Sequence, residues 1–381
     1  MIRPTLLVAV VAALVWPWPS APAPAGATEP LIVRVGIQVD RPALQLAADG
    51  PVQVVQPDTG AVATLPGAPW TVQATAGGLS LAGTGFGAVV RLTPQSGTMR
   101  VEGRSYRGTI EVHRTPAGRV TAIDELPLEQ YLYGVIKGEI DPHWPPEAVK
   151  AQAVAARTLA VERIEEAHAA VTGYDLAATT DAQVYLGVAG EDPAATAAVD
   201  ATRGLLVTYD GRPIFAAYHS NSGGHTEDSE NVWGTAYPYL RGVADPYAMS
   251  APGVSWTATV PLGTLASSLT RGGVQVSSLD GVELGRVTPW GRAITVRVRG
   301  DGGSVQEISA NRFRLLVGAG VVRSTMFTAS RRGADAVFNG RGSGHGVGLD
   351  QWGARAMAAQ GSTFREILQF YYTGVSIGQV Y

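Results

Sequence analysis

Glu139 is the residue of this chain whose sequence surroundings best suit acid–base chemistry. Apolar residues recur at helical spacing between 128 and 136, and Pro142 ends this helix because the residue before a proline avoids helical backbone angles. Glu139 is therefore expected at the C-terminal end of a helix, where the helix dipole disfavours the ionised carboxylate. A carboxyl group held partly protonated, near cations and an aromatic residue such as Trp144, is what a general acid needs.

Two cations follow on the next predicted helix, which begins at Pro145 and continues through an alanine-rich segment. Lys150 and Arg157 are seven residues apart and therefore lie on one face of that helix. Two interpretations remain open at this point. Either the cations set the protonation state of a Glu139 that acts as a general acid, or Glu139 is merely a buried ion-pair partner of one of them. Position and spacing alone favour the ion pair.

A loop at residues 218–225, with the sequence Tyr-His-Ser-Asn-Ser-Gly-Gly-His, has small and polar residues that suit the binding of a ligand. The Asp-Gly pair at 210–211 predicts a hairpin turn, and the second strand of that hairpin leads into the loop. Small residues let a ligand approach the backbone, and hydroxyl and amide groups suit sugar hydroxyls. Trp233, Tyr237 and Tyr239 follow closely and could form a sugar platform, although ordinary packing is favoured for any one of them.

Glycines alternate with other residues between 340 and 348. One possible function of this segment is phosphate binding, but the spacing of its glycines is not Gly-x-Gly-x-x-Gly and no βαβ unit follows. We interpret the segment as a strand or loop in which missing side chains leave room for a ligand or a neighbouring backbone. The remaining alternative is that the glycines serve tight packing only. His345 and Gln351 are then expected to face the cleft that holds Glu139.

The histidines of the 218–225 loop raise the question of a metal. His219 and His225 are six residues apart, and Glu227 or Asp228 could supply a third ligand. This is not a recognisable zinc spacing, and the chain contains no His-Glu-x-x-His motif. We therefore predict no bound metal and no cofactor, with the histidines acting as hydrogen-bonding groups of a cleft.

Three segments of the chain resemble the signature of the SpoIID/LytB family, in the family's order. They span residues 131–158, 218–225 and 340–354, and the first contains Tyr-Leu-x-Gly-Val-Ile-x-x-Glu-Ile, whose glutamate is Glu139. The resemblance covers about residues 118–381. The family contains the stage II sporulation protein D, a lytic transglycosylase of bacterial cell-wall glycan, and the amidase enhancers. Some relatives bind zinc through cysteines and histidines of the second segment, but this chain has no cysteine.

The resemblance implies cleavage of peptidoglycan glycan between N-acetylmuramic acid and N-acetylglucosamine, with a 1,6-anhydro product. One carboxyl group suffices, because the nucleophile is a hydroxyl of the substrate, whereas a hydrolase would usually need a second carboxylate. Asp141 is the nearest second carboxylate, but it is expected to be tied to the turn before Pro142. The predicted catalytic residues are Glu139, Lys150 and Arg157, and the predicted substrate-binding residues are Tyr218, His219, Ser222, Gly223, Gly224, His345 and Gln351.

Two other functions stay open. The chain could be a non-catalytic glycan-binding module that recruits or stimulates a cell-wall amidase, as the enhancer branch of the family suggests. The presence of Glu139, Lys150 and Arg157 together favours the enzyme, because a pure binding module has little use for that set. A metallopeptidase acting on stem peptides lacks a ligand set.

Composition predicts an α+β protein. With 381 residues the chain is long enough for two domains, and its 47 glycines and 24 prolines between short apolar runs indicate many strands and turns. We expect a β-rich domain at 28–117 and a mixed α/β SpoIID-like catalytic domain at 118–381. The latter is expected to contain a strand-rich insertion at about 251–335, to which no chemistry is assigned.

The N-terminus and the charge balance bear on location and partners. Residues 1–27 combine Arg3, a short apolar core and a small-residue cleavage site, which predicts a signal peptide, with a retained anchor as the alternative. No second apolar stretch could span a bilayer, so the mature protein is expected outside the cytoplasm and associated with the cell wall. The 29 Lys and Arg are balanced by 32 Asp and Glu, which argues against a nucleic-acid partner. The expected partners are glycan strands and, in the alternative, an amidase.

Overall fold

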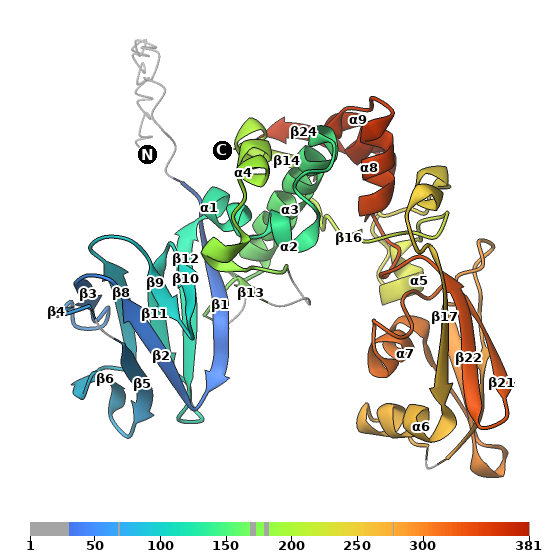
Figure 1. Ribbon diagram of the computed structural model, residues 1–381, viewed down its shortest axis with the longest axis horizontal. Helices are drawn as coiled ribbons and strands as arrows, with labels where there is room; N and C mark the ends of the chain where they lie inside the picture. The colour runs from blue at the N-terminus through green and yellow to red at the C-terminus, as the bar shows by residue number, and fades with distance from the viewer. Residues whose placement is uncertain (1–29, 68, 168–172, 179–182, 277, 381) are drawn as a thin grey trace, which may run out of the picture. The chain divides into compact units, whose positions relative to one another are not determined.

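The computed structural model describes residues 30–67, 69–167, 173–178, 183–276 and 278–380 of the chain. Within these ranges, helices and several separate sheets make up an α+β fold whose N-terminal region is built from strands (Figure 1). The predicted fold class is therefore confirmed. The predicted signal peptide lies outside the described residues.

Two sheets make up the N-terminal region, because short apolar runs alternate there with glycine and proline turns. In β5 (Trp70–Thr75), for example, Trp70 and Val72 are buried while their neighbours Thr71 and Gln73 are exposed. The larger sheet has the order β13 (Leu176–Ala177), β1 (Ile32–Arg41), β12 (Val120–Pro127), β11 (Thr109–Arg114), β8 (Val89–Pro94), β3 (Val52–Val55) and β4 (Val62–Leu65). The smaller sheet has the order β10 (Arg104–Tyr106), β9 (Met99–Val101), β2 (Ala43–Ala48), β5, β6 (Gly78–Leu81) and β7 (Thr84–Phe86).

The N-terminal sheets share a hydrophobic core with the helices that follow. Strand β12 pairs antiparallel with β1 and runs directly into α1 (Leu128–Tyr133). Buried residues of β1 and β12 belong to the same cluster as Tyr131 of α1 and Ala153 of the next long helix. The predicted domain boundary between residues 117 and 118 stays a prediction. The shared hydrophobic core contains residues from both sides of that boundary.

Short helices followed by a long one position Glu139. The predicted helix before Pro142 is two pieces, α1 and α2 (Ile136–Glu139), and Glu139 is the last residue of the second. Helix α3 (Pro146–Ala167) begins one residue after the predicted start at Pro145, and its alanines between positions 148 and 160 are buried on nearly every face. Around α3 pack α4 (Pro193–Ala201) and, close to α1 and α2, the 3-10 turn η1 (Gly187–Gly190).

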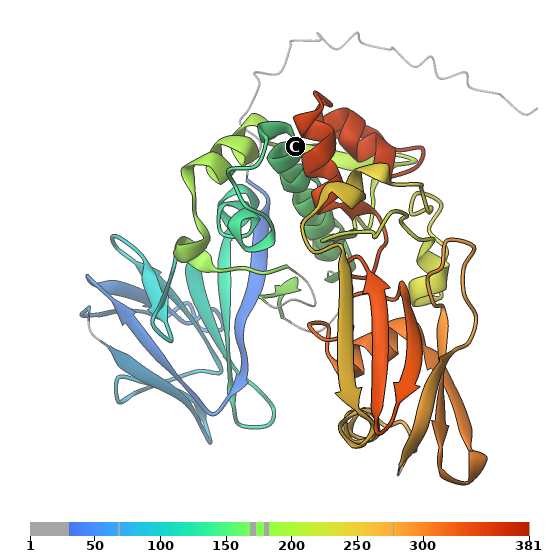
Figure 2. The same cartoon turned by 45° about the vertical axis from the view of Figure 1, so that its right-hand side comes forward.

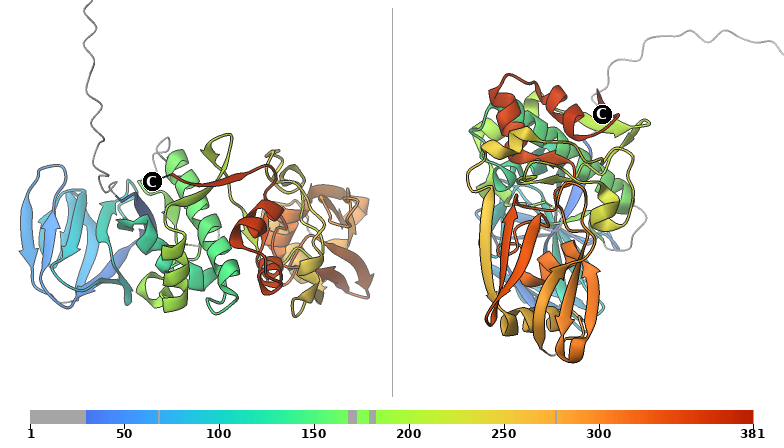
Figure 3. Two further views of the ribbon diagram at one scale, coloured as in Figure 1. Left: turned by 90° about the horizontal axis from the view of Figure 1, so that it is seen from above. Right: turned by 90° about the vertical axis from the view of Figure 1, so that its right-hand side faces the viewer.

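Elements of the C-terminal part of the chain pack against α3. The predicted hairpin exists as β14 (Leu205–Tyr209) and β15 (Arg212–Pro213), and the last strand, β24 (Ser376–Gln379), pairs with β14 (Figure 3). The predicted cap at Thr363 is a complete capping box with Glu366. The remaining elements here are β16 (Tyr218–His219), α5 (Ser229–Trp233), η2 (Pro246–Ser250), β23 (Leu349–Asp350), α8 (Gln351–Ala359) and α9 (Phe364–Tyr371).

The segment expected to be an insertion has a hydrophobic cluster of its own, formed by residues between 256 and 338. It contains two three-stranded antiparallel sheets. In one of them the strands lie in the order β17, β22 and β21, side by side in Figure 2. Its elements are β17 (Ser255–Pro261), α6 (Leu262–Arg271), β18 (Leu279–Leu284), β19 (Thr295–Gly300), η3 (Asp301–Gly303), β20 (Val305–Ser309), α7 (Ala310–Val317), β21 (Phe327–Arg332) and β22 (Asp335–Arg341).

None of the helices in the described part of the chain is long and apolar enough to cross a bilayer.

Candidate functional site

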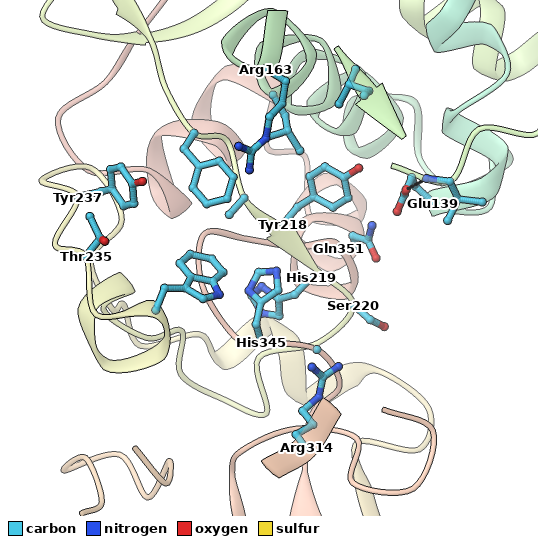
Figure 4. Close-up of a pocket in the computed structure, with 17 residues that line it drawn as sticks. Glu139, Arg163, Tyr218, His219, Ser220, Thr235, Tyr237, Arg314, His345 and Gln351 are labelled. Carbon is cyan, nitrogen blue, oxygen red and sulfur yellow. Dashed lines mark hydrogen bonds between the residues drawn. The ribbon is translucent and has the colours of Figure 1, made fainter. Parts of the chain in front are cut away.

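A cavity of about 710 Å³ collects residues from α2, α3, the 217–220 segment and the glycine-rich segment before β23. Figure 4 shows Glu139 and Tyr237 at opposite ends of it, with Arg163 and Arg314 on opposite sides. It is lined by Glu139, Leu159, Arg163, Leu176, Val184, Phe215, Ala217, Tyr218, His219, Ser220, Trp233, Thr235, Tyr237, Arg314, Gly344, His345 and Gln351. Glu139 is the one carboxyl group among these described lining residues.

Glu139 has an environment that opposes its ionisation. Burial raises the pKa of Glu139 above the ordinary glutamate value, and this effect outweighs two hydrogen bonds that favour the carboxylate. The backbone N–H of Val184 donates to Oε1 of Glu139 over 2.9 Å, and the hydroxyl of Tyr218 donates to the same carboxylate. The sequence argument expected a raised pKa from the helix dipole, but α2 is only four residues long and desolvation is the main cause. The group can therefore hold a proton and also be stabilised after losing it.

Parallel pairing of two very short strands brings the two glycine-rich motifs together. Tyr218 and His219 of β16 pair with Leu349 and Asp350 of β23. The following loop is held by a bridge between Asn221 and a residue of the second motif. Segments more than 120 residues apart in the sequence therefore form one wall of the cavity.

The glycines of the second motif mostly make room for neighbouring protein. A Cβ on Gly342 would lie 2.7 Å from the carbonyl oxygen of Asn221, and one on Gly348 would lie 2.2 Å from that of Ala217. Both glycines have positive φ angles, which other residues rarely adopt. Of the alternating glycines, Gly344 also lines the cavity. The neighbouring-backbone interpretation thus describes Gly342 and Gly348. Gly344 is the glycine of this motif that lines the cavity, and a Cβ there would lie 2.8 Å from the Cβ of His219.

His219 and His345 lie next to each other in the wall, with ring centroids 5.4 Å apart. Burial lowers the pKa of His345 to about 3 and that of His219 well below its usual value, so both rings are neutral. Nδ1 of His219 lies 3.1 Å from the carbonyl oxygen of Val347, which can only accept, so this nitrogen carries the hydrogen. Nδ1 of His345 accepts from the N–H of Val347 over 3.1 Å, so its hydrogen is on Nε2.

An aromatic wall closes the end of the cavity away from Glu139. Trp233 and Tyr237 both contact Phe215, with ring centroids 5.4 and 5.7 Å from that of Phe215. The guanidinium of Arg163 lies 5.0 Å from the centre of the Phe215 ring. Trp233 and Tyr237 line the cavity as the platform interpretation expected, whereas Tyr239 packs beside them without lining it.

Lys150 and Arg157 do not contact Glu139, so the expected catalytic set is not assembled. Arg157 is fully buried and forms a two-pronged ion pair with Glu129, at 2.9 and 2.8 Å. Lys150 pairs with Glu147 one turn earlier on the same helix, at 2.7 Å. Neither cation lines the cavity. The physical reason is that each has a nearer carboxylate, which sequence spacing alone did not single out.

Ser222, Gly223 and Gly224 also lie outside the cavity lining. The hydroxyl of Ser222 donates to Asp245 over 2.9 Å, and its N–H donates to Asp350 over 2.6 Å. A Cβ on Gly223 would meet backbone atoms of the second motif at 3.0 Å, and Gly224 has a φ of 111°. These three expected substrate-binding residues instead hold the loop against the rest of the fold, while Tyr218, His219, His345 and Gln351 do line the cavity.

No group of three histidines, cysteines or carboxylates in the described part of the chain is arranged to hold a metal. His225 stacks on Trp290 with ring centroids 4.0 Å apart, and its Nδ1 lies 2.6 Å from the carbonyl oxygen of Thr226. It lies outside the lining of the cavity that His219 faces.

Sequence reasoning missed several lining residues. Arg163 had a usable signal, because it follows Leu159 by four residues and so shares the α3 face that lines the cavity. Arg314 had none, because it lies on α7 of the insertion, far away in the sequence. Thr235 and Ser220 likewise reach the cavity through tertiary folding alone.

The residues 116–209 match the family model described as Stage II sporulation protein. A Stage II sporulation protein D from Bacillus subtilis is 32% identical over 286 residues, which cover 71% of this chain and 79% of that protein. This chain belongs to the SpoIID/LytB family. The predicted family membership is thereby confirmed.

Two further relatives of this SpoIID/LytB chain differ in their names and in their degree of identity. A protein from Brachyspira hyodysenteriae, named only as uncharacterized, is 37% identical over 255 residues, or 67% of each chain. A protein named Amidase enhancer from Bacillus subtilis is 29% identical over 344 residues, which cover 77% of this chain and 47% of the enhancer.

Proposed function

We propose that this SpoIID/LytB protein cleaves the glycan strands of peptidoglycan by lytic transglycosylation. The observation that supports this most is the position of Glu139, the one carboxyl group among the described cavity-lining residues, with a pKa raised by burial. A reaction whose nucleophile belongs to the substrate needs one such group, whereas hydrolysis usually needs two.

Glu139 acts first as an acid and then as a base. Its proton passes to the glycosidic oxygen as the bond between that oxygen and the anomeric carbon of N-acetylmuramic acid breaks. The carboxylate then accepts the proton of the muramic 6-hydroxyl while O6 bonds to the anomeric carbon, which gives a 1,6-anhydro end and consumes no water. Burial favours the acid, and the donors Tyr218 and Val184 stabilise the carboxylate that follows.

The cavity walls suit a glycan. Trp233 and Tyr237 offer apolar ring faces against which sugar rings can pack, and Gln351 and Ser220 offer hydrogen bonds to sugar hydroxyls. Arg314 adds positive charge, which favours the carboxylate groups that peptidoglycan carries, whereas Arg163 already pairs with Glu162 and Glu166 of its own helix. Lys150 and Arg157 have no part in this scheme, because their partners are Glu147 and Glu129.

The substrate determines the expected location. A protein that acts on peptidoglycan works outside the cytoplasm and at the cell wall, and no cofactor or nucleic acid enters the scheme.

A second function is favoured by the similarity to the Amidase enhancer, which covers 77% of this chain. In that case the cavity binds glycan without cleaving it, and the protein recruits or stimulates a cell-wall amidase. Both functions need glycan in the cavity, and they differ in whether Glu139 reacts.

Digestion of purified glycan strands, with and without stem peptides, tests the proposal. Product masses are compared for the wild type, Glu139→Gln and the control Asp141→Asn, whose side chain is exposed and two residues away. We expect 1,6-anhydromuramic ends from the wild type and the control, and none from Glu139→Gln. Binding of strands without cleavage by any of the three would favour the enhancer function. Dependence on Asp141 would instead indicate hydrolysis with a second carboxylate.

A further inference from the structure

Gln183 is a buried side chain directly behind the cavity that the proposed reaction does not use. It is 1% exposed and precedes Val184, the residue whose N–H donates to Glu139. Its amide contacts three groups. The Tyr131 hydroxyl donates to Oε1 over 2.9 Å, and Nε2 lies 3.1 Å from the Ala156 carbonyl oxygen and 3.2 Å from the Tyr218 hydroxyl.

The chemistry of these neighbours fixes the orientation of the amide. The carbonyl of Ala156 can only accept a hydrogen bond, so the nitrogen of Gln183 must face it. The oxygen then faces Tyr131, which donates its single hydrogen. The second hydrogen of the amide nitrogen points to Tyr218, whose oxygen must accept it.

Tyr218 consequently has one hydrogen left to donate. Its hydroxyl points towards Glu139 in Figure 4, and a hydrogen bond from Tyr218 favours the Glu139 carboxylate. Burial raises the pKa of Tyr218 well above its ordinary value, so the hydroxyl keeps this hydrogen. Hydrogen bonds therefore run in one direction from Tyr131 through Gln183 and Tyr218 to the carboxylate. Tyr131 and Tyr218 lie in or against the hydrophobic core, and Tyr185, two residues after Gln183, belongs to it as well, which makes the direction a property of the fold.

We propose that Gln183 is a positioning residue, whose amide fixes the Tyr218 hydroxyl as a hydrogen-bond donor to Glu139. The geometric claim stands on the contacts of Gln183 and on the direction of the Tyr218 hydroxyl, and its catalytic consequence rests on the proposed function. Removing the amide frees the Tyr218 hydroxyl to rotate away, so the carboxylate of Glu139 loses part of its stabilisation. The pKa of Glu139 then rises.

The test is a double-mutant cycle read by carbon-13 NMR of the Glu139 carboxyl group, assigned with Glu139→Gln. Tyr218→Phe is expected to raise this pKa by about one unit, because a hydrogen bond to a charged group is lost. Gln183→Met is expected to raise it in the wild type but not in the Tyr218→Phe background. Tyr133→Phe is the control, since that hydroxyl donates to Asp200 outside the chain of contacts.

Equal shifts from Gln183→Met in both backgrounds would overturn the proposal, because a merely structural effect does not depend on Tyr218. If Gln183→Met does not fold, the same cycle uses Gln183→Glu, which keeps the side-chain shape and turns the donor into an acceptor. The coupling between the two substitutions remains the measured quantity.

No substrate is needed for this measurement, so a failure here is distinct from a failure to cleave glycan. If cleavage is observed, the alkaline limb of kcat/KM should move with the pKa.

Discussion

At the residue scale, the site depends on a carboxyl group that is hard to ionise. Glu139 is buried, and the two donors Val184 and Tyr218 do not fully offset the loss of water. The neutral histidines His219 and His345 add no positive charge that would favour the carboxylate. Such a group is protonated at higher pH than an ordinary glutamate, which suits a general acid.

The pH dependence of cleavage follows from this. A general acid must be protonated, so kcat/KM falls as pH rises through the pKa of Glu139. Because burial raises that pKa, we expect the midpoint of this alkaline limb above pH 4.5, the ordinary glutamate value. A pH–rate profile on glycan strands measures it. A midpoint at or below the ordinary value would contradict the role given to desolvation.

Arg157 gives a contrasting prediction, because its charge is paired far from the reaction. Arg157→Met removes the guanidinium that donates to both oxygens of the buried Glu129 carboxylate, and we expect the free energy of unfolding to fall by about 3–5 kcal/mol. The double variant Arg157→Met with Glu129→Gln should recover part of the loss, since the buried negative charge is removed as well. Denaturant unfolding measures both. Full stability together with abolished cleavage would point back to a catalytic Arg157.

At the element scale, a buried arginine is one of the side chains that tie the insertion to the cavity. Arg292 follows β18 and is 1% exposed. Its guanidinium donates to the carbonyl oxygens of Ser222 and His225, over 2.7 and 3.2 Å. The guanidinium carbon would lie 2.4 Å from a Cβ on Gly346, so it also fills the space beside the second motif. The insertion thus supports both motifs and also supplies Arg314 to the cavity wall.

We therefore expect Arg292→Met to weaken binding of glycan strands at least about tenfold, because two backbone acceptors lose their donor and the loops shift. Arg299→Met is the matched control, since Arg299 lies on the same insertion and its exposed side chain pairs with Glu283. Calorimetric titration with glycan strands compares the two. Equal affinities would show that the insertion does not support the cavity.

At the scale of the whole molecule, a buried carboxyl group links stability to pH. Burial raises the pKa of Asp124 from 3.8 to about 7, although the Tyr185 hydroxyl donates to it over 2.8 Å. The folded state therefore binds this proton more tightly than the unfolded state does. The resulting stabilisation is present below about pH 4 and is lost as pH rises towards 7.

Asp124→Asn should remove this dependence, because an amide stays neutral at every pH. We expect the wild type to lose up to about 4 kcal/mol of unfolding free energy between pH 4 and 8 through this group, and the variant to lose correspondingly less. Denaturant unfolding at a series of pH values gives both curves. Parallel curves would mean that Asp124 ionises normally in the folded protein.

Local sequence patterns predicted much of the fold. The proline pair before α3, the Asp-Gly turn after β14 and the Thr363 capping box each depend on neighbouring residues, and each is present. The partner of Arg157 could not be predicted in this way, because Glu129 is 28 positions away on another helix. Arg314 and Gln183 likewise reach Glu139's surroundings only through long-range packing. Motif resemblance located the cavity, but it could not separate Tyr218, which lines it, from Ser222, which supports it.

The central claim is that the muramic 6-hydroxyl, and not water, takes the place of the leaving sugar. Digestion of glycan strands in water enriched in oxygen-18 tests this directly, with products read by mass spectrometry. Lytic transglycosylation by Glu139 predicts new ends that carry no oxygen-18 and are lighter by one water than reducing ends. Incorporation of one oxygen-18 atom at each new end would show hydrolysis and contradict the account.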